Sequence, residues 1–205
     1  TSTRLNGMRV AMVTFSPFPS DPRPRRAVEA LLGEGMSVDL ICLHDGALSR
    51  SEKDDRLNVS RLRIAHRRGG FLSYAYQYSA FISASAAIVG VRSLMRPYDL
   101  VYVHNMPDIL VTSSLMAKAR GAKVILDMHD PMPELMSTIF GFGTDSVPVR
   151  VLRYLEKWSM ARADSVLTVN TACKRIFASR SCSSDKIHVV MNSPDDGVFP
   201  FHRPE

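Results

Sequence analysis

Residues 123–134 read KVILDMHDPMPE, an unbroken apolar run that ends in polar side chains and two prolines. A short run that is apolar on both faces is typical of a strand buried inside a parallel sheet. The same pattern recurs along the chain, at residues 9–15 (RVAMVTF), 37–43 (SVDLICL), 99–104 (DLVYVH), 165–169 (SVLTV) and 186–191 (KIHVVM). The sequence therefore predicts a parallel α/β sheet.

Helical patterns separate these strands, and we expect helices over residues 25–34, 73–95, 108–119, 149–162 and 171–179. Residues 61–67 (RLRIAHR) alternate charged and apolar side chains, which predicts a half-buried edge strand. We predict one domain over residues 1–192, a doubly wound, Rossmann-like α/β fold. Its mostly parallel sheet has about seven strands, with helices on both faces. The tail, residues 193–205, is rich in Pro and Asp and is expected to be a linker.

Composition excludes several classes of protein. The chain has 205 residues, of which 45% are hydrophobic and 22% charged, so disordered and low-complexity classes do not apply. Three cysteines without a C-x-x-C pair exclude a disulfide scaffold and a zinc ribbon, and they suit a reducing compartment. The opening residues TSTRLNG are polar, so we expect no signal peptide and a cytoplasmic protein.

Positive charge is concentrated in the N-terminal third. The net charge is +6, and residues 1–70 carry 12 basic against 8 acidic groups. Such a surface could meet phosphates or acidic lipid, or it could simply be solvated. It lacks interleaved aromatics and a known nucleic-acid motif, so no nucleic-acid partner is expected. The apolar stretch 73–95 is diluted by Gln77, Arg92 and serines, which favours a helix packed on the sheet or touching a membrane over a spanning one.

Several catalytic signatures are absent from the sequence. There is no Walker A sequence, no G-x-S-x-G, no H-E-x-x-H and no D-x-D, and both G-x-G triplets (33–35 and 141–143) lie in the wrong context for a dinucleotide. His129 with Asp127 and Asp130 could hold a metal, but a single local cluster without a distant partner is a weak case. We therefore expect neither a metal nor a bound cofactor.

Candidate site residues follow the strands, because ligands of doubly wound sheets bind at the carboxyl ends of the strands. His129 can donate a hydrogen bond or move a proton near neutral pH, although it could instead cap a turn. The arginines after the first strand can grip phosphate beside a helix N-terminus, or be a solvated helix start. The candidate catalytic residue is His129, and the candidate binding residues are Ser16, Arg23, Arg25, Arg26, His104, Asn105, Asp130, Glu134 and Asn170.

Five stretches together resemble the N-terminal domain of GT-B glycosyltransferases, specifically the retaining, family 4-like group (glycosyltransferase group 1). They are residues 8–32, 98–110, 122–135, 155–170 and 186–199. The resemblance implies an enzyme of two Rossmann-like domains with its active site between them. The N-terminal domain would bind the acceptor, and a C-terminal domain with an E-x7-E signature would hold most of the nucleotide-sugar. His129 matches the histidine that lies near the transferred sugar.

Two departures from the family pattern bear on activity. No E-x7-E region occurs in these 205 residues, so we expect an acceptor-binding half, inactive without its missing C-terminal domain. The loop after the first strand has prolines and arginines where many relatives have adjacent glycines.

The expected partners are a nucleotide-sugar donor and a glycan or lipid-linked acceptor, with peripheral contact at the inner face of the membrane. The alternatives are a free-standing, non-catalytic binding module and a subunit of a split glycosyltransferase.

Overall fold

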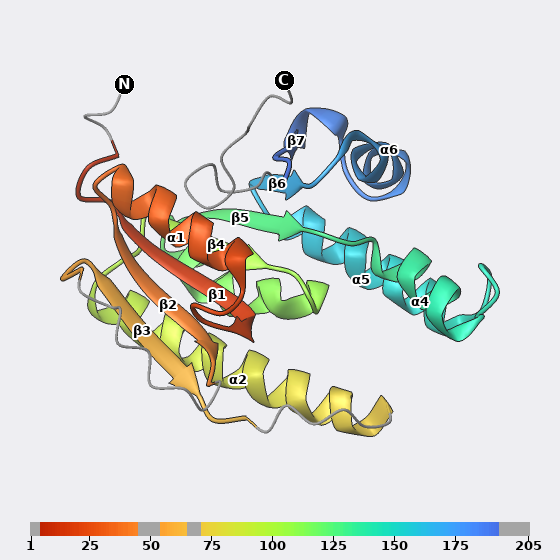
Figure 1. Cartoon of the computed structure of the whole chain (residues 1–205), viewed down its shortest axis with the longest axis horizontal. Coiled ribbons are helices and arrows are strands. Elements are labelled where there is room, and N and C mark those ends of the chain that lie inside the picture. The colour runs from red at the N-terminus through yellow and green to blue at the C-terminus, as the bar shows by residue number, and fades with distance from the viewer. Residues whose placement is uncertain (1–4, 45–53, 65–70, 193–205) are drawn as a thin grey trace, which may run out of the picture.

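The structure, a computed structural model, describes residues 5–44, 54–64 and 71–192. One seven-stranded sheet runs through these residues in the order β3-β2-β1-β4-β5-β6-β7, and every neighbouring pair is parallel (Figure 1). The strands are β1 (Arg9–Pro17), β2 (Ser37–Leu43), β3 (Leu57–Leu62), β4 (Leu100–His104), β5 (Lys123–Met128), β6 (Ser165–Thr168) and β7 (Ile187–Val189). The predicted parallel, Rossmann-like sheet is confirmed.

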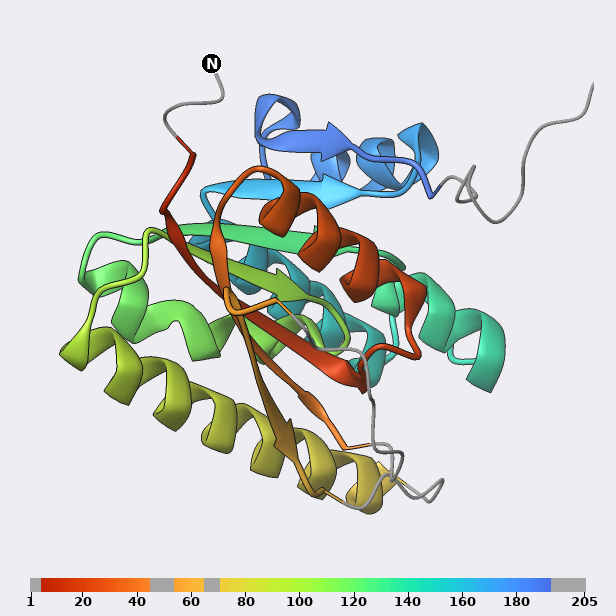
Figure 2. The same cartoon turned by 60° about the vertical axis from the view of Figure 1, so that its left-hand side comes forward.

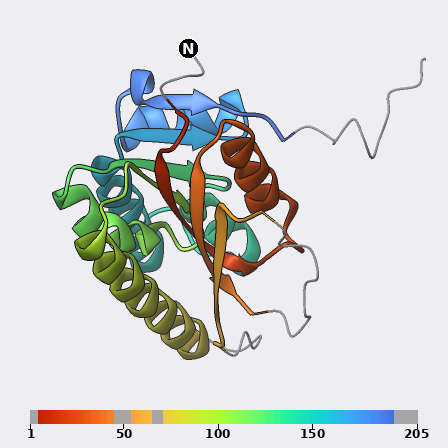
Figure 3. The same ribbon diagram turned by 90° about the vertical axis from the view of Figure 1, so that its left-hand side faces the viewer.

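Helices cover both faces of the sheet. Figure 3 shows α1 (Pro22–Gly33) on one side and α2 (Phe71–Met95) on the other. The 3-10 helix η2 (Asp108–Ser114), α3 (Leu115–Ala119) and α5 (Val147–Arg162) pack on the same side as α2. Figure 2 shows α6 (Thr171–Arg180) beside β6 and β7 at one end of the sheet, opposite β3. Two further helices complete the described chain, α4 (Met132–Phe140) and the 3-10 helix η3 (Ser184–Lys186).

The central strand shows why both faces are apolar. Successive side chains of a strand point to opposite faces. Val10 and Met12 of β1 pack in the cluster that contains Val28 of α1. Ala11 and Val13 point the other way and pack in the cluster that contains Phe81 of α2. All four of these β1 side chains are fully buried. Burial of a Val or Met side chain stabilises the fold by about 1.5–3 kcal/mol, so β1 anchors both layers.

Two predicted elements need correction. The edge strand begins at Leu57 rather than at residue 61 and ends at Leu62, because the backbone already pairs with β2 from Val38 onward; residues 65–67 lie outside the described residues. The predicted helix over 108–119 is a 3-10 helix to Ser114 and an α-helix only afterwards. Hydroxyls in this segment bond carbonyls three residues back, as Ser113 Oγ does to Leu110 O at 2.7 Å, and this favours the tighter turn.

The helix α4 was not predicted from the sequence. Two prolines within residues 131–134 favour a fixed loop when the sequence is taken alone, but in the structure Pro133 lies in the first turn of α4. Proline is well accommodated there, because the first amides of a helix have no intrahelical partner. The helix ends at Gly141, whose positive φ of 66° suits a glycine at a helix terminus.

The long helix α2 lies along the sheet rather than apart from it. It inserts Phe81 and Val89 into the core, while Tyr76 and Met95 are exposed. Among the described residues it is the one helix long and apolar enough to cross a membrane, by length and composition alone, and 28% of that apolar stretch is buried. The packing agrees with the sheet-packed alternative, and contact with a membrane stays a prediction.

Candidate active site

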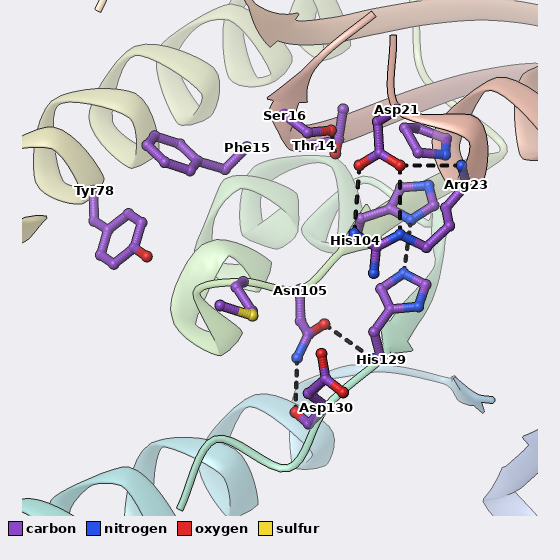
Figure 4. Close-up of a pocket in the computed structure, with 12 residues that line it drawn as sticks. Thr14, Phe15, Ser16, Asp21, Arg23, Tyr78, His104, Asn105, His129 and Asp130 are labelled. Atoms are coloured by element: carbon purple, nitrogen blue, oxygen red, sulfur yellow. Dashed lines mark hydrogen bonds and ion pairs between the residues drawn. The ribbon is translucent and has the colours of Figure 1, made fainter. Parts of the chain in front are cut away.

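A cavity of about 200 Å³ opens at the carboxyl ends of β1, β4 and β5. This is the switch point of the sheet, because the chain leaves β1 toward β2 on one side and returns to β4 on the other. Loops diverge at such a point and leave a crevice. Figure 4 shows the lining side chains, which are Thr14, Phe15, Ser16, Asp21, Arg23, Pro24, Tyr78, His104, Asn105, Met106, His129 and Asp130.

Two buried histidines face each other in this cavity. His104 ends β4 and His129 directly follows β5, and their rings are stacked with centroids 5.7 Å apart and an interplanar angle of 8°. His104 Nδ1 lies 3.4 Å from His129 Nε2 (Figure 4). Neighbouring parallel strands bring these side chains together, since His104 is the register partner of Asp127, two residues before His129.

Burial keeps both imidazoles uncharged at neutral pH. Desolvation lowers the pKa of His104 to about 4, although the carboxylate of Asp127 opposes the shift. Desolvation also lowers the pKa of His129, again against the pull of Asp127. Each ring therefore offers one nitrogen that donates and one that accepts a hydrogen bond. A neutral imidazole can bind and orient a hydroxyl group without carrying charge into the cavity.

Asn105 fixes the loop that carries His129. Its Oδ1 accepts a hydrogen bond from the His129 backbone N–H at 3.0 Å. Its Nδ2 donates to Asp108 Oδ1 at 3.1 Å. It also contacts the Asp130 carbonyl oxygen at 3.4 Å (Figure 4). The amide therefore links the end of β4, the start of η2 and the loop after β5, and holds the position of His129.

Asp108 is a buried carboxyl group behind this amide. Burial raises its pKa to about 7, while the hydrogen bond from Asn105 opposes the shift. Its second oxygen, Oδ2, is buried and has no hydrogen-bond partner in the part of the chain that the structure describes. Asp108 is therefore protonated over most of the acidic range and ionises near neutrality.

The first turn of α1 brings a guanidinium to the cavity. Asp21 is the N-cap of α1 and accepts the Arg23 backbone N–H at 3.1 Å. Its carboxylate also lies 3.4 Å from Arg23 Nε. Burial would raise the pKa of Asp21, but hydrogen bonds from Arg23 and Ser16 outweigh it, and the pKa falls below its ordinary value. The pair keeps Arg23 over the cavity, as Figure 4 shows.

Six of the predicted site residues line the cavity together, namely Ser16, Arg23, His104, Asn105, His129 and Asp130. Four others lie outside its lining. Arg25 lies 3.6 Å from Glu29 along α1, and Glu134 pairs with Arg180. Asn170 caps α6 by accepting the Cys173 N–H at 2.8 Å, and Arg26 also lies on α1. The binding roles of these four residues stay predictions, as do the roles of the six that line the cavity.

Some lining residues were not foreseen from the sequence. Tyr78 reaches the cavity from α2, and Phe15 contacts it edge-on, with ring centroids 4.9 Å apart. The tyrosines of α2 form no strand-end motif, so only the packing of α2 reveals which of them face the site. Asp21 could have been found, because an Asp two residues before an arginine at a helix start is an N-cap that also pairs.

The chain belongs to the glycosyl transferase 4-like domain family, because the sequence pattern of that family matches residues 20–193. A comparison with curated protein sequences finds no significant match. The resemblance to the N-terminal domain of GT-B glycosyltransferases is confirmed by this family match and by the fold.

Solved structures share the fold at low sequence identity. Sucrose-phosphate synthase from Thermosynechococcus elongatus is 12% identical with a TM-score of 0.66, over 93% of this chain and 49% of that one. Phytolacca americana UGT2, solved with UDP-2-fluoro-glucose and pterostilbene, is 11% identical with a TM-score of 0.61, over 95% and 56% of the two chains. A UDP-N-acetylglucosamine 2-epimerase is 17% identical with a TM-score of 0.56, over 90% and 48%. The present chain thus spans about half the length of these proteins.

Proposed function

We propose that the chain is the acceptor-binding half of a retaining glycosyltransferase, which moves a sugar from a nucleotide-sugar to a glycan or lipid-linked acceptor. One observation carries the proposal: in a glycosyl transferase 4-like domain, a cavity at the switch point of the sheet is lined by His129, His104 and Arg23. Phytolacca americana UGT2, of similar fold, is solved with a UDP-sugar and a second organic ligand.

The side chains of the cavity suit the charges that develop during sugar transfer. As the bond between the anomeric carbon and the diphosphate breaks, positive charge develops on the sugar and negative charge on the leaving group. Arg23 and the N-terminus of α1 can stabilise the leaving diphosphate. The neutral imidazole of His129 can hydrogen-bond a sugar hydroxyl and orient the ring. In this proposal His129 binds and polarises the sugar rather than removing a proton.

The donor side of the active site belongs, in this proposal, to a second domain that follows residues 193–205. The chain covers only about half of sucrose-phosphate synthase and of Phytolacca americana UGT2, which supports a second domain in the native protein. The mass of the native protein tests this arrangement, by immunoblot of the source cells with an antibody to this domain. A band near twice 22.8 kDa is expected. A band near 22.8 kDa would contradict the two-domain chain, and the enzyme would then need a separate partner chain to complete its active site.

The activity is tested on the native-length protein with a panel of nucleotide-sugars and with glycan and lipid-linked acceptors. Product is detected by mass spectrometry, and the anomeric configuration of the new linkage is determined by NMR. We expect one donor to give a glycosylated product that keeps the anomeric configuration of the donor. An inverted product would contradict the retaining mechanism, and release or isomerisation of the sugar without transfer would contradict the transferase.

A further inference from the structure

The two histidines form part of a three-membered cluster with Asp127. His104 Nδ1 lies 3.4 Å from His129 Nε2 and 3.4 Å from Asp127 Oδ2, and His129 Nε2 lies 3.6 Å from the same carboxylate oxygen. These three atoms thus form a nearly equilateral triangle. The sequence shows only the local half of this cluster, because His104 comes from a strand more than twenty residues earlier.

The sides of this triangle, 3.4–3.6 Å long, match the distances between neighbouring metal ligands better than those of short hydrogen bonds. The two distances to the carboxylate oxygen are longer than the separation of about 2.7–3.2 Å that is typical of hydrogen bonds between nitrogen and oxygen, and the distance between the two ring nitrogens, 3.4 Å, is at the long end for a hydrogen bond. In a tetrahedral zinc site, bonds of about 2.0–2.1 Å place neighbouring ligand atoms about 3.3–3.4 Å apart. One ion could therefore contact all three atoms with little movement of the side chains.

The surroundings hold the three side chains in place. Asp127 and His104 are paired in register on β5 and β4, and Asn105 accepts the His129 backbone N–H at 3.0 Å. Tyr102 donates its hydroxyl hydrogen to Asp127 Oδ2 at 2.9 Å. An outer hydrogen bond to a ligating carboxylate is a recurrent feature of metal sites, because it fixes the orientation of the ligand.

The charge around the triangle favours a cation. Asp127 is buried, and in the described part of the chain no lysine or arginine pairs with it; the basic groups beside it are the two histidines, which are uncharged at neutral pH. Three further charged groups act electrostatically on His129, namely the carboxylates of Asp21 and Asp130 and the guanidinium of Arg23. The negative charges among them outnumber the positive one. A buried carboxylate without a cation is costly, and a divalent ion bound to the triangle would compensate it.

We propose that His104, Asp127 and His129 bind one divalent ion of the zinc class, at the floor of the cavity. Two imidazoles and one carboxylate suit Zn²⁺ and its spectroscopic substitute Co²⁺, whereas Mg²⁺ and Ca²⁺ prefer oxygen ligands throughout. Both histidines line the cavity, so a fourth coordination position is open to solvent or a small ligand. If the proposed function holds, zinc and the sugar compete, because His129 Nε2 cannot serve both.

Binding is measured by titrating the untagged, chelator-treated chain with Zn²⁺ in a calorimeter, and with Co²⁺ followed by visible absorption. We expect one equivalent of each ion, a Co²⁺ spectrum typical of four-coordination, and no binding of Mg²⁺. Asp127→Asn keeps the shape of the side chain and should weaken Zn²⁺ binding at least 100-fold. Tyr102→Phe removes only the outer hydrogen bond and should weaken it about tenfold.

The matched control is His188→Gln, because His188 is exposed on β7 and lies outside the cavity. It should bind Zn²⁺ as the parent does. Thermal melts without metal establish whether each variant folds. If Asp127→Asn does not fold, Tyr102→Phe tests the metal site in its place. No binding by the parent, or equal binding by the parent, Asp127→Asn and Tyr102→Phe, would overturn the site.

Competition with the sugar is tested separately on the native-length protein. Saturating Zn²⁺ should lower the transfer rate, and a chelator should restore it. Unchanged transfer at saturating zinc would overturn the competition. A protein that binds zinc at the triangle but transfers no sugar in the absence of zinc would contradict the proposed function, and would leave the metal site standing.

Discussion

Asp108 is the residue whose environment departs most from that of an ordinary aspartate in this structure. Its carboxyl group is buried behind Asn105, and burial raises its pKa to about 7 from an ordinary 3.8. Between these two values the unfolded chain has already released its proton while the folded chain still holds it. The unfolded state is therefore increasingly favoured as the pH rises from about 4 to 7, and this residue destabilises the fold above that range.

Replacement of Asp108 by Asn should remove this pH dependence, because the amide oxygen can still accept the hydrogen bond from Asn105. Relative to the parent, the free energy of unfolding of Asp108→Asn should improve by about 2–4 kcal/mol as the pH is raised from 4 to 8. Urea unfolding across this range measures it, with the exposed Asp145→Asn as the control. A difference between Asp108→Asn and the parent that does not change with pH would contradict the assigned burial.

The sequence predicts the cavity residues that directly follow strands, but it does not predict those that reach the cavity only through the packing of a helix. His104, Asn105 and His129 could be predicted, since the ends of neighbouring parallel strands must meet. Tyr78 could not, because several tyrosines of α2 look alike in sequence. Arg23 lines the cavity and Arg25 does not, because residues two positions apart on a helix face different directions.

Helices α4, α5 and α6 are tied together by one arginine. Arg180 of α6 donates to Glu156 of α5 at 2.9 and 2.6 Å and to Glu134 of α4 at 2.8 Å. Glu156 is fully buried and also accepts the Ser181 hydroxyl, whereas the Glu134 side chain is 41% exposed. Glu134 thus helps to secure α4, the helix that follows the His129 loop, and its predicted role in binding substrate stays a prediction.

Replacement of Arg180 by Met should leave the Glu156 carboxylate buried without a cation, which costs about 3–5 kcal/mol of stability. Glu134→Gln should cost about 1 kcal/mol or less, because that carboxylate is partly solvated. Urea unfolding at neutral pH compares the two variants with the parent. Equal, small losses for both would show that the buried pair does not stabilise the packing of these helices.

Most elements could be predicted because their apolar periods are unambiguous. β2 occupies the predicted residues 37–43, and β5 takes up residues 123–128, the start of the run 123–134 that predicts it. The wrong predictions fall where the same residues are compatible with two local structures. Prolines permit a helix start as well as a loop, as at α4. Side-chain hydroxyls tighten residues 108–114 into a 3-10 helix where an α-helix was predicted.

The molecule as a whole carries a net charge of +6 and an apolar helix whose side chains are partly exposed. A lipid-linked acceptor would require the protein to approach an acidic membrane surface, and basic residues near such a surface contribute about 1 kcal/mol each. Arg67 and Arg68, which lie outside the described residues, precede α2 and are the basic residues chosen for the test.

The charge-reversal variant Arg67→Glu/Arg68→Glu should reduce co-sedimentation with anionic vesicles at least tenfold in affinity, and should leave the low binding to neutral vesicles unchanged. The control is Arg120→Glu/Lys123→Glu, which makes the same change in charge at exposed residues where β5 begins. Binding to anionic vesicles that is equal for both variants and the parent would contradict membrane contact through this segment.

The most direct test of glycosyl transfer at the switch-point cavity compares His129→Gln with His188→Gln in the native-length protein. Both changes replace a histidine by a side chain of similar reach, but only His129 lines the cavity. We expect kcat/KM for sugar transfer to fall about 100-fold or more in His129→Gln, the effect of losing one well-placed hydrogen-bonding group, and to stay unchanged in His188→Gln. Equal kcat/KM values in His129→Gln, His188→Gln and the parent would contradict transfer at this cavity.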